Sequence, residues 1–524
     1  MKLNLSQRQL SWLSIALLWL LLLVLASTRN LALPDEGRYA DVGRWMWLSG
    51  DWLAPRLNGI PFFHKPPLLH WLQASSFSVL GVGAWSARLI PAMHAGIMLV
   101  VMYLAARTYA SEQHARAAVL ILGSSVGFLI AGQYVNHDML VAAWISVAIW
   151  CFALSFRSTD RVDVALSLSG FAACAMAFLS KGLIGFVLPG FVIFCWLLWT
   201  GQIVRLRQMP WLRGILLWSV LSLPWFIVGQ MKYSELFNYL IIGQHFSRYV
   251  GDKFNNQWGW WFYGAVLTAM LFPWSLLVLQ DLRPLRWFKT WQADRKNPAR
   301  HYESLLWIWA LCISVFFSFP KSKIVGYILP VLPPLACLAA LAWGKWAVRG
   351  RSPLIFTGLL IASLGLSVTL NWQAGKYSLK HSSKDIAMTL SCALNPADRV
   401  FVTDDYPYDL PFYAQLKNPM YVAIDWDQAR IDQSDNWRRE LYEGANFDAK
   451  AGEVLVPFSA IDNPPAGSWL VVPLGFNVSQ LHPSWTQYAK GNAWVLLRAH
   501  NLTLESPPTT QDESLKRCKN QSAS

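Results

Sequence analysis

The chain has 524 residues, of which 54% are hydrophobic and only 14% are charged, and it contains 30 Trp. Soluble domains carry about 25% charged residues, so this composition excludes an ordinary soluble enzyme and predicts a membrane protein. The same hydrophobicity excludes a disordered protein. The formal net charge of +14 must be located along the chain before it is taken to indicate any partner.

The basic residues are distributed unevenly. Residues 372–524 carry 14 Lys and Arg against 17 Asp and Glu, a net charge of −3, which leaves +17 for residues 1–371. All of the basic excess therefore lies in the apolar part of the chain, where the cytoplasmic loops of membrane proteins collect it. The charge indicates membrane topology and no nucleic-acid partner.

Apolar windows of ~17–25 residues predict membrane-spanning helices. About eleven are expected, near 11–27, 86–106, 117–131, 139–156, 164–179, 183–200, 214–230, 258–280, 302–319, 325–343 and 353–371. The first is read as an uncleaved signal anchor, which places the N-terminus in the cytoplasm. Alternation from there puts basic residues in all six cytoplasmic segments, as the positive-inside rule requires.

The predicted fold is thus mainly α: a polytopic domain over residues 1–371, with a loop at 28–85 on the outer, periplasmic face of a bacterial inner membrane. Residues 372–505 are expected to form a small α/β domain on that same face, followed by a disordered tail at 506–524. A helix is expected near 380–394. The strand-like runs are Arg399–Thr403, Pro419–Ile424, Glu453–Phe458, Trp469–Val472 and Trp494–Arg498.

Two acids, Asp35 and Glu36, follow the first span directly and begin a segment with helical spacing. In this segment Arg38, Asp41 and Arg44 are polar, and the residues between them are largely apolar, so we expect a helix lying along the membrane surface. A helix N-cap is an alternative role for Asp35.

Several basic residues lie on the outer face against the charge rule: Lys65, Lys181, Arg248, Lys321 and Lys323. A lysine beside a membrane is often a snorkelling anchor. Five misplaced cations, however, favour an anionic ligand such as a phosphate at the membrane boundary.

A further acid, Asp138, stands at the outer mouth of the fourth predicted span. A helix cap is the alternative role for it. We expect the first loop, this acid and the misplaced cations to line one cavity.

These segments resemble a known family. The motifs are Asp-Glu-x-Arg-Tyr-Ala, Gly-Asp-Trp-x-x-Pro-Arg-Leu-Asn-Gly-x-Pro-Phe-x-x-Lys-Pro-Pro-Leu, Ser-Lys-Gly, Gln-His-Phe-x-Arg-Tyr and Ser-Lys-x-x-x-Tyr-Ile-Leu-Pro. Together they are similar to the bacterial aminoarabinose transferases of lipid A, which belong to the GT-C membrane glycosyltransferases and are related to the protein O-mannosyltransferases. The resemblance spans about residues 30–335.

The resemblance implies roles for the site residues. Asp35 and Asp138 become the acids at the reaction centre, with Asp35 ranked first as the catalytic carboxylate. The binders of a polyprenyl phosphate would be Arg38, Lys65, Lys181 and Tyr327, with Lys321 or Lys323 nearby. Glu36 and Arg248 are further candidates for contact with substrate.

A metal site is also implied, but its first ligand differs here. His245 falls where the family places a metal-binding histidine, and His64 stands where the family has a glutamate. Because imidazole is a good zinc ligand, this pair could still hold Zn²⁺.

The expected activity is therefore transfer of a sugar from a polyprenyl-phosphate donor to lipid A, core oligosaccharide or another envelope glycan, by a single inverting displacement. Cations stabilise the departing phosphate, and an aspartate orients or deprotonates the acceptor. A protein O-mannosyltransferase-like enzyme is one alternative. A transporter or flippase of lipid-linked saccharide is another, although such proteins favour ionisable residues at the membrane midplane.

Overall fold

The structure is a computed structural model that describes residues 5–158, 160–247, 256–281, 295, 297–347, 353–432 and 435–500. Contacts divide the chain into two compact units. Unit 1 contains Met1–Ser27, His64–Leu69 and Arg88–Asn371, and unit 2 contains Thr28–Phe63, His70–Ala87 and Trp372–Ser524. The predicted tail at 506–524 lies outside the described residues.

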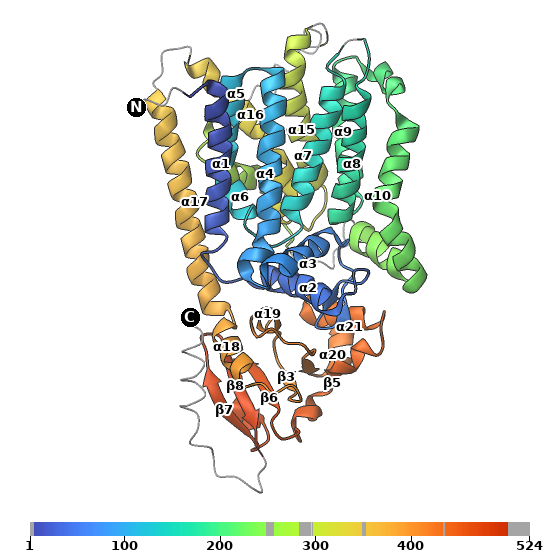
Figure 1. Ribbon diagram of the computed structural model, residues 1–524, viewed down its shortest axis with the longest axis vertical. Helices are drawn as coiled ribbons and strands as arrows, with labels where there is room; N and C mark the ends of the chain where they lie inside the picture. Colours follow the sequence, from blue (N-terminus) through green and yellow to red (C-terminus); the bar gives the residue numbers. More distant parts are fainter. Residues whose placement is uncertain are drawn as a thin grey trace. The chain divides into compact units, whose positions relative to one another are not determined.

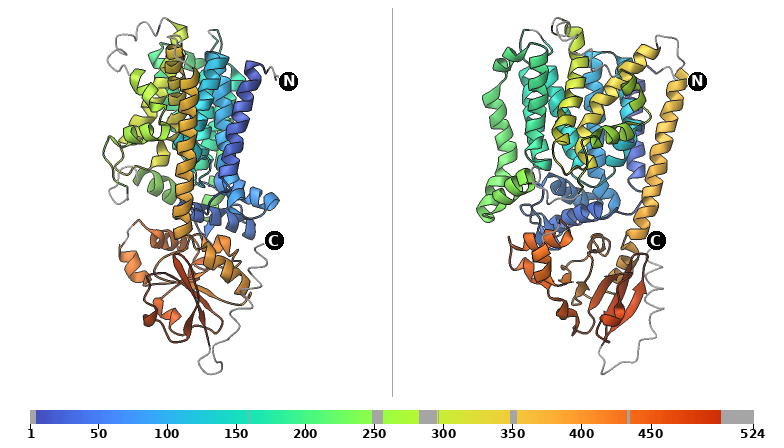
Figure 2. Two further views of the ribbon diagram at one scale, coloured as in Figure 1. Left: turned by 90° about the vertical axis from the view of Figure 1, so that its left-hand side faces the viewer. Right: turned by 180° about the vertical axis from the view of Figure 1, so that it is seen from behind.

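Long apolar helices build unit 1, and they run side by side in Figures 1 and 2. Among the described residues, eight helical segments are long and apolar enough to cross a membrane. They are α1 (Gln7–Leu25), α4 (Ala84–Tyr109), α7 (Asp138–Ser155), α8 (Val164–Lys181), α10 (Trp211–Lys232), α15 (His301–Ser318), the run of η4 (Val325–Val331) into α16 (Leu332–Ala347), and α17 (Pro353–His381). The last of these starts in unit 1 and ends in unit 2.

The other three predicted spans are shorter or interrupted. Helix α9 (Ile184–Trp199) has 16 residues. The span expected at 117–131 is split at Ser125 into α5 (Glu112–Ser124) and α6 (Val126–Ala131), and the span expected at 258–280 is split into α12 (Phe262–Leu271) and α13 (Ser275–Asp281). Apolar composition predicted these segments, but it does not show where a helix is interrupted.

Local sequence explains where several helices begin. Ser6 caps α1 in a capping box with Gln9, so each side chain accepts a backbone N–H of the other residue. The Asp163 carboxylate accepts the Leu166 N–H and starts α8. Short elements connect the unit: η1 (Ile203–Gln208), the π-helix η2 (Asn238–Ser247) and η3 (Pro298–Arg300).

Unit 2 contains a six-stranded mixed sheet, visible in Figure 2. The strand order is β5 (Leu455–Val456), β4 (Tyr421–Ala423), β3 (Val400–Val402), β6 (Trp469–Pro473), β8 (Trp494–Ala499) and β7 (Trp485–Lys490). The pairs from β5 to β6 are parallel, and β8 is antiparallel to both of its neighbours. All five predicted strands and the predicted helix, α18 (Lys384–Ala393), are confirmed.

One strand of this six-stranded sheet, β7, was missed. Its sequence Trp-Thr-Gln-Tyr-Ala-Lys buries only its first residue, because β7 is an edge strand. Besides α18, the described helices of the C-terminal segment are α19 (Leu410–Tyr413), α20 (Trp426–Asp432) and α21 (Trp437–Ala445), with 3₁₀ turns η5 (Ala451–Val454), η6 (Phe458–Ile461) and η7 (Val478–Gln480).

The residues of the first loop share a hydrophobic core with this sheet. Alternate strand residues such as Val400, Val422 and Leu496 pack in one cluster with Val42 and Ile60 of the loop. The loop contributes α2 (Asp35–Ser49), the hairpin β1 (Arg56–Leu57) and β2 (Ile60–Pro61), and α3 (Leu68–Leu80), whose residues from His70 on belong to unit 2. This common core groups the loop with residues 372–500.

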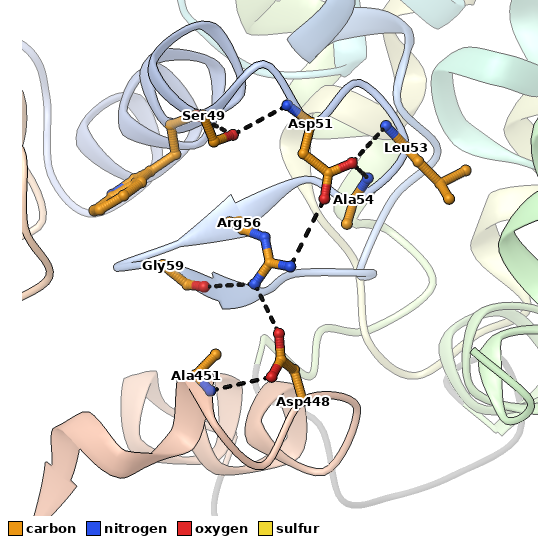
Figure 3. A network of polar contacts seen from close by, with 9 residues as sticks. Ser49, Asp51, Leu53, Ala54, Arg56, Gly59, Asp448 and Ala451 are labelled. Atoms are coloured by element: carbon orange, nitrogen blue, oxygen red, sulfur yellow. Dashed lines mark hydrogen bonds and ion pairs between the residues drawn. The ribbon is translucent and has the colours of Figure 1, made fainter. Parts of the chain in front are cut away.

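An ion pair also joins the hairpin to the C-terminal residues (Figure 3). The Arg56 guanidinium donates to the Gly59 carbonyl at 2.8 Å and to Asp448 Oδ2 at 3.1 Å, and it lies 3.7 Å from Asp51 Oδ2. Asp448 in turn accepts the Ala451 N–H.

The prediction that the segment at 35–49 is helical is confirmed, and its position along the membrane surface stays a prediction. Both Asp41 and Arg44 of its expected polar face are buried. They pair with each other at 2.7 Å, and Arg44 Nη1 donates to the Leu416 carbonyl. The polar face is covered by the C-terminal residues, a contact that helical spacing does not reveal.

Candidate functional site

An enclosed ion pair joins two of the predicted site residues of unit 1, Asp138 and Lys181. Asp138 is the first residue of α7 and Lys181 the last of α8. The two helices have 18 residues each and are joined by a short connection at their other ends, so they run antiparallel and Asp138 lies beside Lys181. The Lys181 ammonium donates to Asp138 Oδ1, and each side chain is only 9% exposed. A buried charge requires such a partner.

The helix-cap alternative for Asp138 is wrong. The N-cap position of α7 is His137, and no side chain caps it. Instead, Asn136 donates to Asp138 Oδ2 at 2.9 Å and accepts the Asp138 N–H at 3.0 Å, while His137 Nδ1 lies 2.9 Å from the Ser180 carbonyl. The Asp138 carboxylate is thus oriented by side chains toward Lys181.

A third element, η4, packs against this ion pair. The Lys181 ammonium lies 4.1 Å from the centre of the Tyr327 ring, a cation–π contact. Gly326 packs so closely on the Asp138 carboxyl that a Cβ added there would overlap it. The structure therefore brings together three of the predicted residues, Asp138, Lys181 and Tyr327.

Lys321 and Lys323 precede η4 and differ from each other. Lys323 is buried, and its ammonium donates to the carbonyls of Trp258 at 2.8 Å and Pro320 at 2.5 Å. Lys321 is exposed, and its backbone carbonyl accepts the Trp258 N–H. Of the two, Lys321 has the more exposed side chain.

The first-loop acid Asp35 belongs to unit 2. The N-cap of α2 is Pro34, without a side-chain cap, so the N-cap alternative for Asp35 is wrong as well. Its carboxylate pairs with Arg38 one turn later and is 38% exposed. An acid that has no cap role and is open to solvent is available for chemistry.

The sequence of this chain is similar to those of known membrane glycosyltransferases. Residues 64–227 match the family described as dolichyl-phosphate-mannose-protein mannosyltransferase. The chain is similar to the undecaprenyl phosphate-alpha-4-amino-4-deoxy-L-arabinose arabinosyl transferase 2 of Pseudomonas fluorescens, at 32% identity over 62% of this chain and 55% of the relative. A Pseudomonas aeruginosa transferase of the same kind is 31% identical over 69% of this chain and 64% of the relative. The aligned regions thus span between half and two thirds of these two relatives.

Among solved structures, ArnT from Cupriavidus metallidurans bound to undecaprenyl phosphate has a TM-score of 0.77 at 24% identity, over 95% of this chain and 99% of that one. The chain has an ArnT-like GT-C fold. An archaeal oligosaccharyltransferase from Archaeoglobus fulgidus is a more distant neighbour, with a TM-score of 0.52 and 14% identity over 88% of this chain and 69% of that one.

Within this GT-C fold, the other predicted ligands are placed as follows. Glu36 is fully buried, pairs with Arg29 and accepts the Ala32 N–H at 2.8 Å. This placement gives Glu36 a structural role in fixing the start of α2, and its contact with substrate stays a prediction. Lys65 is half-buried in the short His64–Leu69 segment of unit 1. Arg248 lies outside the described residues.

The predicted metal pair is only partly described. The His64 ring lies 5.8 Å from the Tyr239 ring, centre to centre, while His245 lies in η2 with its side chain outside the described residues. No group of three or more His, Cys, Asp or Glu side chains that could hold a metal occurs in the described part of the chain.

Sequence reasoning missed the partners that the C-terminal residues supply to the first loop. Glu440 of α21 pairs with Arg38 and accepts a hydrogen bond from the Tyr408 hydroxyl at 2.8 Å. Asn436 caps α21, and this cap together with amphipathic spacing is the only local signal in the segment. The signal indicates a helix but not its partner, which lies 402 positions earlier.

Proposed function

We propose that this protein is a membrane glycosyltransferase that moves a sugar from a polyprenyl-phosphate donor to an envelope acceptor such as lipid A. The observation that carries the proposal is the enclosed Lys181 ammonium, held by Asp138 and the Tyr327 ring. A fixed cation of this kind suits a phosphate leaving group. The similarity to transferases named for undecaprenyl phosphate and 4-amino-4-deoxy-L-arabinose supports aminoarabinose as the sugar.

In the proposed reaction, the bond between the anomeric carbon and the donor phosphate breaks, and an acceptor oxygen forms the new bond on the opposite side, which inverts the anomeric centre. Lys65, Lys181 and Lys321 stabilise the negative charge that stays on the polyprenyl phosphate. Asp35 orients or deprotonates an acceptor hydroxyl. An acceptor phosphate would need orientation only, because it is already ionised.

For the topology we propose a bacterial inner-membrane protein with a cytoplasmic N-terminus and the C-terminal domain in the periplasm. The positive-inside distribution supports this orientation. Cys392 of α18 is disulfide-bonded, which suits an oxidising compartment such as the periplasm.

A zinc ion held by His64 and His245 stays a proposal, and no step of the reaction is assigned to it. Two imidazoles are half of the four ligands that a zinc site usually has. Metal analysis of the purified protein, compared with a His64→Ala variant, tests it: an equal zinc content in the two proteins would reject His64 as a ligand.

A second candidate is transfer to protein hydroxyl groups, which the match of residues 64–227 to the protein mannosyltransferase family favours. Both candidates use a polyprenyl-phosphate donor, so the acceptor distinguishes them. Transport of a lipid-linked saccharide is the alternative in which no covalent bond is formed or broken.

The test is reconstitution of the full chain in vesicles with undecaprenyl-phosphate-linked aminoarabinose and lipid A. Mass spectrometry should show lipid A heavier by one sugar residue, and lipid A from cells lacking the gene should lose the same increment. Asp35→Asn provides the inactive control. Donor that crosses the bilayer without any transfer, to lipid A, core oligosaccharide or protein, would reject the proposal in favour of a flippase.

A further inference from the structure

Arg38 lies between two carboxylates that come from distant parts of the chain. One guanidinium nitrogen pairs with Asp35 in the preceding turn of α2, and another pairs with Glu440 of α21. The side chains of Arg38 and Glu440 are 14% and 13% exposed, whereas that of Asp35 is 38% exposed. In this group of three charged side chains, Glu440 is therefore enclosed and Asp35 is open to solvent.

Glu440, the enclosed member of this group, is held by further contacts. The Tyr408 hydroxyl donates to the second carboxylate oxygen of Glu440 at 2.8 Å. The rings of Tyr39 and Tyr408 lie 5.0 and 5.5 Å from the central carbon of the Arg38 guanidinium. Burial raises the pKa of Glu440 above its usual range, and the adjacent Arg38 opposes that rise. Since a guanidinium is planar, fixing one edge of Arg38 also fixes the edge that faces Asp35.

The charges argue against Arg38 as a phosphate ligand. Two carboxylates around one guanidinium leave a net negative charge when both are ionised, and such a group repels an incoming phosphate. The same arrangement suits orientation of a carboxylate, because the guanidinium limits the positions that Asp35 can take.

We infer that Glu440, a residue of the C-terminal domain, is a positioning residue that holds the Asp35 carboxylate in place through Arg38. The inference rests on the proposed function, since it takes Asp35 as the group that activates the acceptor. It makes the C-terminal domain part of the active enzyme, and it replaces the expectation that Arg38 binds the donor phosphate.

The test compares Glu440→Gln with Asp448→Asn in the full-length protein. Gln keeps the shape of Glu440 and can still accept hydrogen bonds, but it loses the charge that holds Arg38. Asp448 also joins the C-terminal residues to the first loop, and its partners in Figure 3 are Arg56 and Ala451, neither of which belongs to the Asp35–Arg38–Glu440 group. The control therefore loses an ion pair of the same kind without disturbing Asp35.

We expect Glu440→Gln to lower kcat about 10- to 100-fold, because small misplacements of a reacting group have effects of that size. KM for the donor should change less than threefold. Asp448→Asn should stay within threefold of wild type in both constants. If Glu440→Gln does not fold, Tyr408→Phe, which removes only one hydrogen bond to Glu440, should give a smaller loss in kcat with the same unchanged KM.

A double-mutant cycle separates positioning from general destabilisation. In an Asp35→Asn background, Glu440→Gln should cause no further loss of turnover, because its target is already gone. Independent, multiplying losses would overturn the inference, and so would equal activity of Glu440→Gln and Asp448→Asn. Full activity of Asp35→Asn alone would instead reject the catalytic role of Asp35 on which the inference rests.

Discussion

Removing Lys181 should destabilise the protein strongly, and removing its partner as well should restore much of the loss. Both Lys181 and Asp138 are 9% exposed, so Lys181→Met leaves a carboxylate without its counter-ion in a nearly closed site. Breaking a buried pair in this way costs about 3–5 kcal/mol. In the double variant Asp138→Asn/Lys181→Met no charge is left without a partner, and most of that energy should return.

The matched control is Lys345→Met. The Lys345 ammonium lies 3.7 Å from Glu303, and the two side chains are 47% and 44% exposed. Exposed pairs of this kind contribute about 0–1 kcal/mol. The control therefore removes a lysine from unit 1 without leaving a buried charge.

The assay is the apparent unfolding temperature of the purified variants in one mild detergent, together with sugar transfer in vesicles. We expect a marked drop for Lys181→Met, nearly wild-type values for the double variant and the control, and transfer activity in the control only. A Lys181→Met protein as stable as the control would refute the reasoning, since the pair would then not be enclosed. An active double variant would remove Lys181 and Asp138 from the reaction.

Three further predictions concern the first loop. Asp35→Asn should lower turnover ~10²- to 10⁴-fold with donor affinity nearly intact, because a general base is lost; turnover within a few-fold of wild type would exclude this role. Lys65→Ala should weaken donor binding by about 1.5–3 kcal/mol, the size of a charge-assisted hydrogen bond, and unchanged affinity would leave Lys65 as a membrane anchor. Burial lowers the pKa of His70 to about 3. Between pH 3 and 6.5 the unfolded chain therefore binds more protons at this residue than the folded protein does. The free energy of unfolding should fall as the pH is lowered through that range, by up to about 1.4 kcal/mol per pH unit. A His70→Gln variant should lack this part of the pH dependence, and an identical dependence in the two proteins would show that His70 does not cause it.

The sequence by itself determined the apolar segments, five of the six strands of the C-terminal sheet and the acids and cations at helix ends. Apolar windows and the alternation of apolar and polar residues depend only on residues close together in the sequence. They therefore predict helices and strands without knowledge of tertiary contacts. Lys181 and Asp138 could be singled out because each charge follows or precedes a long apolar run. Their assignment to one reaction still came from the resemblance to a family.

Only the tertiary structure decided which side chains are paired and which stay open. Asp41 and Arg44 follow the polar face of a helix in sequence but are buried. Arg38 has a basic side chain suited to phosphate, yet its enclosed partner is Glu440. The reason is physical: burial and ion pairing depend on contacts between residues hundreds of positions apart, and helical or strand periodicity carries no information on such contacts.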